Sequence, residues 1–371
     1  MKILWWRALM NSEKQLDEAV ARGIITEDQR NTILADVPDG DQLVAFDEAP
    51  RFFRSFNDIF IGLGVVLLGV AIGVMTRLFP GSEDIAKMVV PAFGAIVFWL
   101  MAEWLARIRR INFPSIVIAV GFLIFVAQFA TNFWAFFSGA DLSSLGDVAF
   151  LKKLGVACKL GFISVLLYAF FARFKLPFSI LLLTGALCMT LFSVLILVFG
   201  SGALEPYLRW IVLAIGITVF IIAMWFDTQD PMRSKRTSDH GFWLHLLAAP
   251  IITHSVLWTT LQPIIQNAKN ADFADDLVVG VILTLFLAFS LIALIIDRRA
   301  LLISSLGYAS AALTYIIYKF DVGENLAFVL TLLLIATLIL ALGTGWQKLR
   351  KSIFQVLPDR DFLRKLPPVK T

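Results

Sequence analysis

The segment DIFIGLGVVLLGVAIGVMTRLF at residues 58–79 decides the fold class, because it is apolar along almost its whole length. A helix of about 20 apolar residues crosses the hydrocarbon core of a bilayer. Nine further segments of this kind follow, at residues 86–106, 113–136, 154–172, 177–199, 207–226, 241–262, 276–296, 300–319 and 325–346. The sequence therefore predicts an all-α, polytopic membrane protein with about ten transmembrane helices.

The composition of the whole chain supports this class. Of its 371 residues, 59% are hydrophobic and 16% are charged, whereas soluble domains contain about 45–50% apolar and about 25% charged residues. An ordinary soluble domain and a disordered chain are both excluded. The two cysteines, Cys158 and Cys188, lie within apolar segments and are too few for a four-ligand zinc site. We expect neither a metal site nor a cofactor.

Basic residues are concentrated in every second loop. They are Arg107, Arg109 and Arg110; Arg173 and Lys175; Arg233, Lys235 and Arg236; Arg298 and Arg299; and Lys348, Arg350 and Lys351. Because loops rich in Lys and Arg stay in the cytoplasm, this alternation predicts that both termini are cytoplasmic. The expected location is a bacterial inner membrane. We therefore attribute the net charge of +4 to the basic cytoplasmic loops that orient the protein in the membrane, and we expect no nucleic-acid partner.

The chain divides into three predicted regions. They are a cytoplasmic helical hairpin in residues 1–55, a transmembrane domain in residues 56–346 and a basic cytoplasmic tail in residues 347–371. In the first region, Ser12–Gln15 and Thr26–Gln29 fit the capping-box pattern, in which a hydroxyl and a carboxamide satisfy the first N–H groups of a helix. Gly23 is expected to end the first of the two short helices.

Polar residues inside the apolar segments are the candidates for function, because polar groups in lipid are costly. The set consists of His254, Gln128, Asn132, His245 and Tyr308. Gln128 and Asn132 are four residues apart and share one helical face. His245 and His254 lie on roughly opposite faces of a straight helix, which makes them poor joint metal ligands. The set predicts either a polar path between the third and seventh segments or hydrogen bonds between neighbouring helices.

The loop between the sixth and seventh segments contains acidic and basic residues close together. They are Asp227, Asp230, Arg233, Arg236 and Asp239. Side chains of opposite charge at this density predict an ion-paired knot that holds the two segments against each other. This reading is structural rather than catalytic.

The same stretch carries a resemblance. Residues 242–250 read FWLHLLAAP and follow Asp227, Asp230-Pro231, Arg233 and a basic run. This pattern resembles uncharacterised multi-pass membrane proteins of Gram-negative bacteria, which are grouped as domains of unknown function. The resemblance implies a membrane location and a helical fold, and it implies no activity.

Two functions remain open on the sequence. We find no P-loop, no GxSxG elbow and no HExxH motif, so an ATP-driven motor is excluded on this chain and an enzyme is uncertain. The leading hypothesis is a transport-like protein of the lipid bilayer with the polar path described above. The alternative is a non-catalytic scaffold or sensor, in which residues 12–36 bind a cytoplasmic partner or a second copy of the chain.

Overall fold

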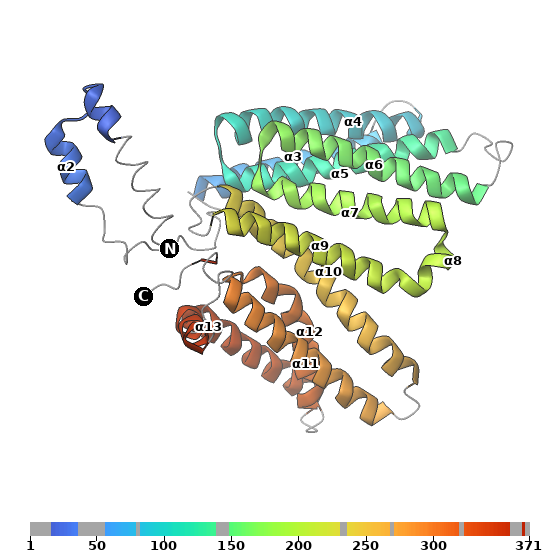
Figure 1. Ribbon diagram of the computed structural model, residues 1–371. Helices are drawn as coiled ribbons and strands as arrows, with labels where there is room; N and C mark the ends of the chain where they lie inside the picture. Colours follow the sequence, from blue (N-terminus) through green and yellow to red (C-terminus); the bar gives the residue numbers. More distant parts are fainter. Residues whose placement is uncertain are drawn as a thin grey trace.

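The computed structural model describes residues 16–35, 56–78, 82–138, 148–230, 236–267, 271–318, 323–356 and 366–367 (Figure 1). Its long helices are α3 (Phe56–Leu78), α4 (Glu83–Met101), α5 (Asn112–Ser138), α6 (Val148–Phe174), α7 (Pro177–Phe199), α9 (Leu208–Gln229), α10 (Arg236–Asn267), α11 (Ala271–Ile296), α12 (Ala300–Tyr318) and α13 (Glu324–Val356). Shorter elements are α2 (Glu27–Ala35), the π-helix η1 (Ala102–Ile108), α8 (Ser201–Leu204) and η3 (Glu205–Tyr207). No strand occurs in these ranges, so the all-α class is confirmed.

Eight of the helical stretches in the described ranges are long and apolar enough to cross a membrane. They lie in α3, α4 with η1, α5, α6, α7, α8 to α9, α11 and α13. The two remaining long helices, α10 and α12, are not among the eight. The membrane class of the sequence analysis is therefore supported, and its count of about ten spans stays a prediction.

Helix α10 joins two groups of helices. In Figure 1, α3 to α7 form one group, α11 to α13 form another, and α9 and α10 run between them. Helix α10 contacts α7 and α9 on one side and α11 and α12 on the other, whereas α13 packs on α11 and α12. Residues placed on α10 can therefore interact with both groups.

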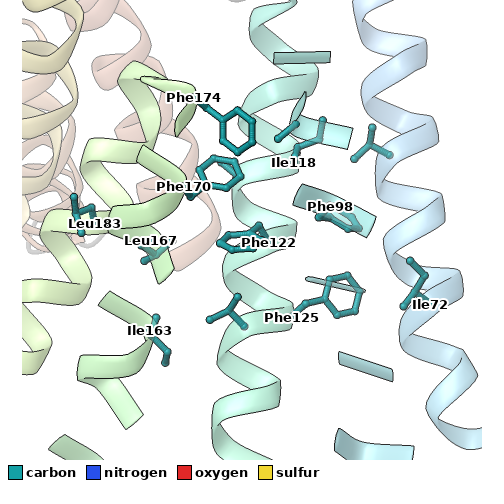
Figure 2. Close-up of a cluster of buried hydrophobic side chains, with 14 of the residues drawn as sticks. Ile72, Phe98, Ile118, Phe122, Phe125, Ile163, Leu167, Phe170, Phe174 and Leu183 are labelled. Atoms are coloured by element: carbon teal, nitrogen blue, oxygen red, sulfur yellow. The ribbon is translucent and has the colours of Figure 1, made fainter. Parts of the chain in front are cut away.

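The first group is held together by an aromatic core (Figure 2). Phe122 of α5 stacks on Phe170 of α6 with ring centroids 4.8 Å apart, and Phe98 of α4 lies 5.2 Å from Phe125 of α5. A Cβ atom at Gly121 would overlap the Phe98 ring, so the missing side chain allows α4 and α5 to approach closely. This core packs α4, α5 and α6 against one another.

Three helical hairpins turn through one residue in the left-handed region. Arg110 (φ 54°) precedes α5, Lys175 (φ 48°) precedes α7, and Asp297 (φ 57°) precedes α12. A left-handed residue is the usual way in which a helix ends, and it keeps the connection short. All three turns lie in loops that the sequence analysis found to be basic, and they join neighbouring antiparallel helices.

Part of the N-terminal region is described. Residues 16–21 are helical, Gly23 ends them with φ 66°, and α2 follows. The Thr26 hydroxyl accepts a hydrogen bond from the Gln29 N–H at 3.2 Å, and the Gln29 side chain accepts one from the Thr26 N–H at 2.9 Å. These are the two bonds of the expected capping box. The corresponding motif at Ser12–Gln15 lies outside the described residues, and the hairpin as a cytoplasmic module stays a prediction.

Candidate functional site

A buried carboxylate near the end of α9 is the centre of the most polar site in the described residues. Arg298 Nε donates a hydrogen bond to Asp227 Oδ2 at 2.9 Å, and Arg298 Nη2 donates to Asp227 Oδ1. Both side chains are almost inaccessible, with 1% of Arg298 and 4% of Asp227 exposed. The two-pronged geometry matches the planar guanidinium to the planar carboxylate, which makes it the strongest form of this contact.

The same carboxylate also receives a histidine from α10. His245 Nε2 lies 2.9 Å from Asp227 Oδ2. An ionised carboxylate can only accept hydrogen bonds, so the His245 N–H is the donor. The His245 ring is fully buried and meets the edge of the Phe220 ring at 5.2 Å between centroids. Asp227, His245 and Arg298, which we call the triad, thus connect α9, α10 and the turn before α12.

Residues at the start of α10 complete the surroundings of the triad. Arg298 Nη2 donates to both the backbone carbonyl and the hydroxyl of Ser238, each at 3.1 Å. A Cβ atom at Gly241 would overlap Asp227 Oδ1. Glycine at this position therefore lets the α10 backbone pass close to the carboxylate.

A second set of buried charges lies on the other side of the same turn. Asp297 precedes Arg298 in the chain and accepts a hydrogen bond from Trp346 Nε1 at 2.7 Å. Arg350 of α13 lies 3.8 Å from Asp297 through its Nη1 atom, and its Nε donates to the Leu294 carbonyl at 3.1 Å. Of these two consecutive residues, Asp297 therefore contacts α13, and Arg298 contacts α9 and α10.

The C-terminal segment covers this second set. Arg350 is fully buried, and its Nη2 donates to the carbonyl of Pro367. Leu366 is also buried and packs with Trp346 and Ala249 in one apolar cluster. Helix α13 continues to Val356 rather than ending near residue 346, so the start of the predicted tail is helical. The described residues of the tail thus pack against α10 and α13.

Two candidates from the sequence analysis meet nearer the middle of α10. His254 Nδ1 lies 2.9 Å from the Tyr308 hydroxyl of α12. The His254 side chain is exposed at the surface of the bundle, whereas Tyr308 is half-buried. A hydroxyl can donate or accept, so this pair can change the position of its proton without losing the hydrogen bond.

The two candidates on α5 are used differently. Asn132 Nδ2 donates to the backbone carbonyl of Lys87 on α4 at 2.8 Å, and Gln128 is exposed. Helices α4, α3 and α6 are the main neighbours of α5. The structure therefore brings His254 to Tyr308 and His245 to Asp227, and it brings Asn132 to α4.

The predicted knot in the loop before α10 is described only in part. Asp227 pairs with Arg298, which is 71 residues away in the chain. Asp230 is buried and Asp239 is half-buried. Arg233 lies outside the described residues, as does the side chain of Arg236. That these residues form one ion-paired knot stays a prediction. The ion-pair partner of Asp227 is Arg298, which lies in the loop before α12.

Five residues of the site were not selected from the sequence. They are Ser238, Asp297, Arg298, Trp346 and Arg350. The available signal was Asp297-Arg298-Arg299, an acidic residue directly at the end of an apolar segment. The sequence alone predicts an ordinary positive loop there, because nothing local distinguishes a buried arginine from one that marks the cytoplasmic side.

Four of the buried charged side chains form two ion pairs. Asp227 is matched by Arg298, and Asp297 by Arg350. A buried charge is tolerated when it is paired and hydrogen-bonded, and the removal of either partner leaves the other uncompensated. In the described ranges, no group of three or more His, Cys, Asp or Glu side chains is arranged to hold a metal ion. The side chains of this site can bind protons, form hydrogen bonds and form ion pairs.

Comparison with known proteins adds nothing to these observations. No family model, curated protein or solved structure matches this sequence. The resemblance of residues 242–250 to uncharacterised bacterial membrane proteins therefore stays a prediction, and the function is argued below from the site alone.

Proposed function

We propose that this chain is a membrane transport protein in which α10 carries the proton-active side chains. One observation supports this proposal most strongly. Helix α10 bears two histidines, and each is hydrogen-bonded to a polar group of a different neighbouring helix: His245 to Asp227 of α9, and His254 to Tyr308 of α12. Ionisable residues within a membrane domain are rare, and they are characteristic of ion and substrate paths.

The hydrogen bonds favour a path on the α12 side of α10. The sequence-based form of the hypothesis placed the path between α10 and α5, lined by Gln128 and Asn132. Asn132 is bonded to the α4 backbone, whereas His254 is exposed and bonded to Tyr308. We therefore assign proton exchange to the His254–Tyr308 pair, and to the triad the role of holding α9, α10 and α12 in register.

Proton movement through reconstituted protein tests this assignment. The full chain is placed in liposomes that contain a pH-sensitive dye, and a potassium diffusion potential drives protons inward. His254→Gln removes the titrating group, so the rate of acidification should fall about tenfold or more. Tyr308→Phe, which keeps the ring and removes the hydroxyl, should reduce the rate less. Gly280→Ala serves as the control, because a Cβ atom there meets no neighbour within 4 Å.

The competing function makes the opposite prediction. If the chain is a scaffold that acts through residues 12–36, deletion of residues 1–50 abolishes its phenotype in the host and His254→Gln has no effect. The exposed ion pair between Arg30 and Asp17, 2.6 Å apart, is the observation that favours a defined surface in this region. Equal proton flux in wild type, His254→Gln and protein-free liposomes would overturn the transport proposal.

We also propose a bacterial inner-membrane location with both termini in the cytoplasm. The support is the alternation of basic loops along the chain. A periplasm-active reporter fused after residue 270 should be active, and the same reporter fused after residue 235 should be silent. An active reporter at residue 235 or a silent one at residue 270 would contradict the ten-span topology.

A further inference from the structure

The end of the bundle formed by η1 and α6 carries a preorganised group of cations. Glu103 Oε2 lies 3.1 Å from Arg107 Nη1, and Glu103 Oε1 lies 2.6 Å from Arg173 Nε. One carboxylate therefore connects η1 to the end of α6 and brings the turns that follow these two helices together. The ion pairs, together with the apolar core below them, hold the two turns in place.

Three more cations follow in the same two turns. Arg109 and Arg110 come after η1, Lys175 comes after α6, and all three side chains are exposed. Among the described residues, no carboxylate lies within ion-pairing distance of them. Arg110 and Lys175 both occupy the left-handed region, so the two turns hold their cations in short, defined connections. With Glu103 shared by two arginines, this end has an excess of positive charge.

An apolar stripe leads directly to these cations. Phe93, Ile96, Leu100 and Trp104 recur three or four residues apart along α4 and η1, and all are exposed. Side chains at this spacing share one face of a helix. The Trp104 ring lies 5.8 Å from the Arg109 guanidinium, at the point where the apolar face meets the charges. Tryptophan prefers this depth, between acyl chains and headgroups.

The helix changes its form at the same point. Residues Ala102–Ile108 form a π-helix, in which the Arg109 N–H donates to the Trp104 carbonyl at 3.0 Å. A π-turn is wider than an α-turn and is often found at functional sites. It also contains Glu103 and Trp104, so the residue that joins the turns and the residue that borders the lipid lie on one irregular segment.

We propose that this end of the bundle, formed by Arg109, Arg110 and Lys175 beside Trp104, is a binding site for the headgroup of an anionic phospholipid. The phosphodiester contacts the three cations, and an acyl chain lies along the stripe from Phe93 to Trp104. Basic clusters between transmembrane helices are suited to anionic headgroups. The stripe argues for a lipid rather than free phosphate, because only a lipid has an apolar part to cover it.

Binding to the purified full chain in a neutral detergent tests the proposal. Phosphatidylglycerol is titrated and the thermal unfolding midpoint and the lipid retained in native mass spectra are followed, with phosphatidylcholine and inorganic phosphate as the other probes. Phosphatidylglycerol should stabilise the wild type and phosphatidylcholine should not. Replacement of Arg109, Arg110 and Lys175 by Gln should weaken phosphatidylglycerol binding by about tenfold or more, without changing the midpoint in detergent alone.

A matched variant separates a site from general attraction. Lys152→Gln, Lys153→Gln and Arg209→Gln together also remove three positive charges. These residues lie near the first residues of α6 and α9, and their replacement should leave phosphatidylglycerol binding unchanged. An equal loss of binding in this control would overturn the proposal. Stabilisation by inorganic phosphate equal to that by phosphatidylglycerol, or no preference for phosphatidylglycerol over phosphatidylcholine, would also overturn it.

Discussion

Asp227→Leu is expected to lower the free energy of unfolding by about 3–5 kcal/mol, because it leaves the buried Arg298 guanidinium without its carboxylate. Arg298→Met should have a similar cost for the converse reason. Both side chains are almost fully buried, so water cannot replace the missing partner. The measurement is unfolding in mixed detergent micelles, with each variant compared to the wild type.

The double variant distinguishes a lost ion pair from a damaged core. Asp227→Leu combined with Arg298→Met removes both charges and fills the space with apolar atoms, a change that is often neutral or stabilising. It should therefore be more stable than either single variant. Costs that simply add would contradict the assignment, because residues in direct contact are expected to be strongly non-additive.

Gly241→Ala is expected to cost about 1–3 kcal/mol, the usual range for overpacking a core. The new Cβ atom would overlap Asp227 Oδ1, and that carboxylate cannot move away while Arg298 and His245 hold it. The same substitution at Gly280 meets no neighbour within 4 Å and should be neutral or slightly stabilising, because Ala favours a helix more than Gly does.

The decisive comparison is between the cost of Gly241→Ala in the wild type and its cost in a chain that lacks the Asp227 carboxylate. In an Asp227→Ala chain, the atom that blocks the new methyl group is gone, so the additional cost of Gly241→Ala should fall markedly. Unfolding of the four chains in this cycle measures the effect. A cost that is unchanged in the Asp227→Ala background would show that Gly241 is needed for some other contact.

Helix positions were largely predictable, because the signal for a membrane helix is local. The segment expected at residues 177–199 coincides with α7, and the one at residues 300–319 differs from α12 by one residue. The segment expected at residues 325–346 is part of the longer α13, which continues to Val356. Hydropathy locates the part that crosses the lipid, and a helix can continue past it with charged residues such as Arg350.

Only part of the candidate site could be selected from the sequence, and the partners of the selected residues could not be predicted. His245, His254, Tyr308 and Asp227 were all selected as polar groups in or beside apolar segments. Local reasoning pairs a charge with its nearest neighbours in the chain, and so it pairs Asp227 with the basic loop that follows. The actual partner, Arg298, is distant in sequence and becomes close only because α9, α10 and the turn before α12 pack together.

The sequence by itself determined that this is an all-helical membrane protein, because crossing a bilayer depends on the length and apolarity of each segment taken alone. Tertiary structure decided which polar groups meet. In the sequence, Arg298 is indistinguishable from other basic loop residues, and Asn132 could line a pore. In the structure, Arg298 is paired with Asp227, and Asn132 donates a hydrogen bond to the α4 backbone. Burial and pairing are properties of several helices together, and they emerge only when those helices are in place.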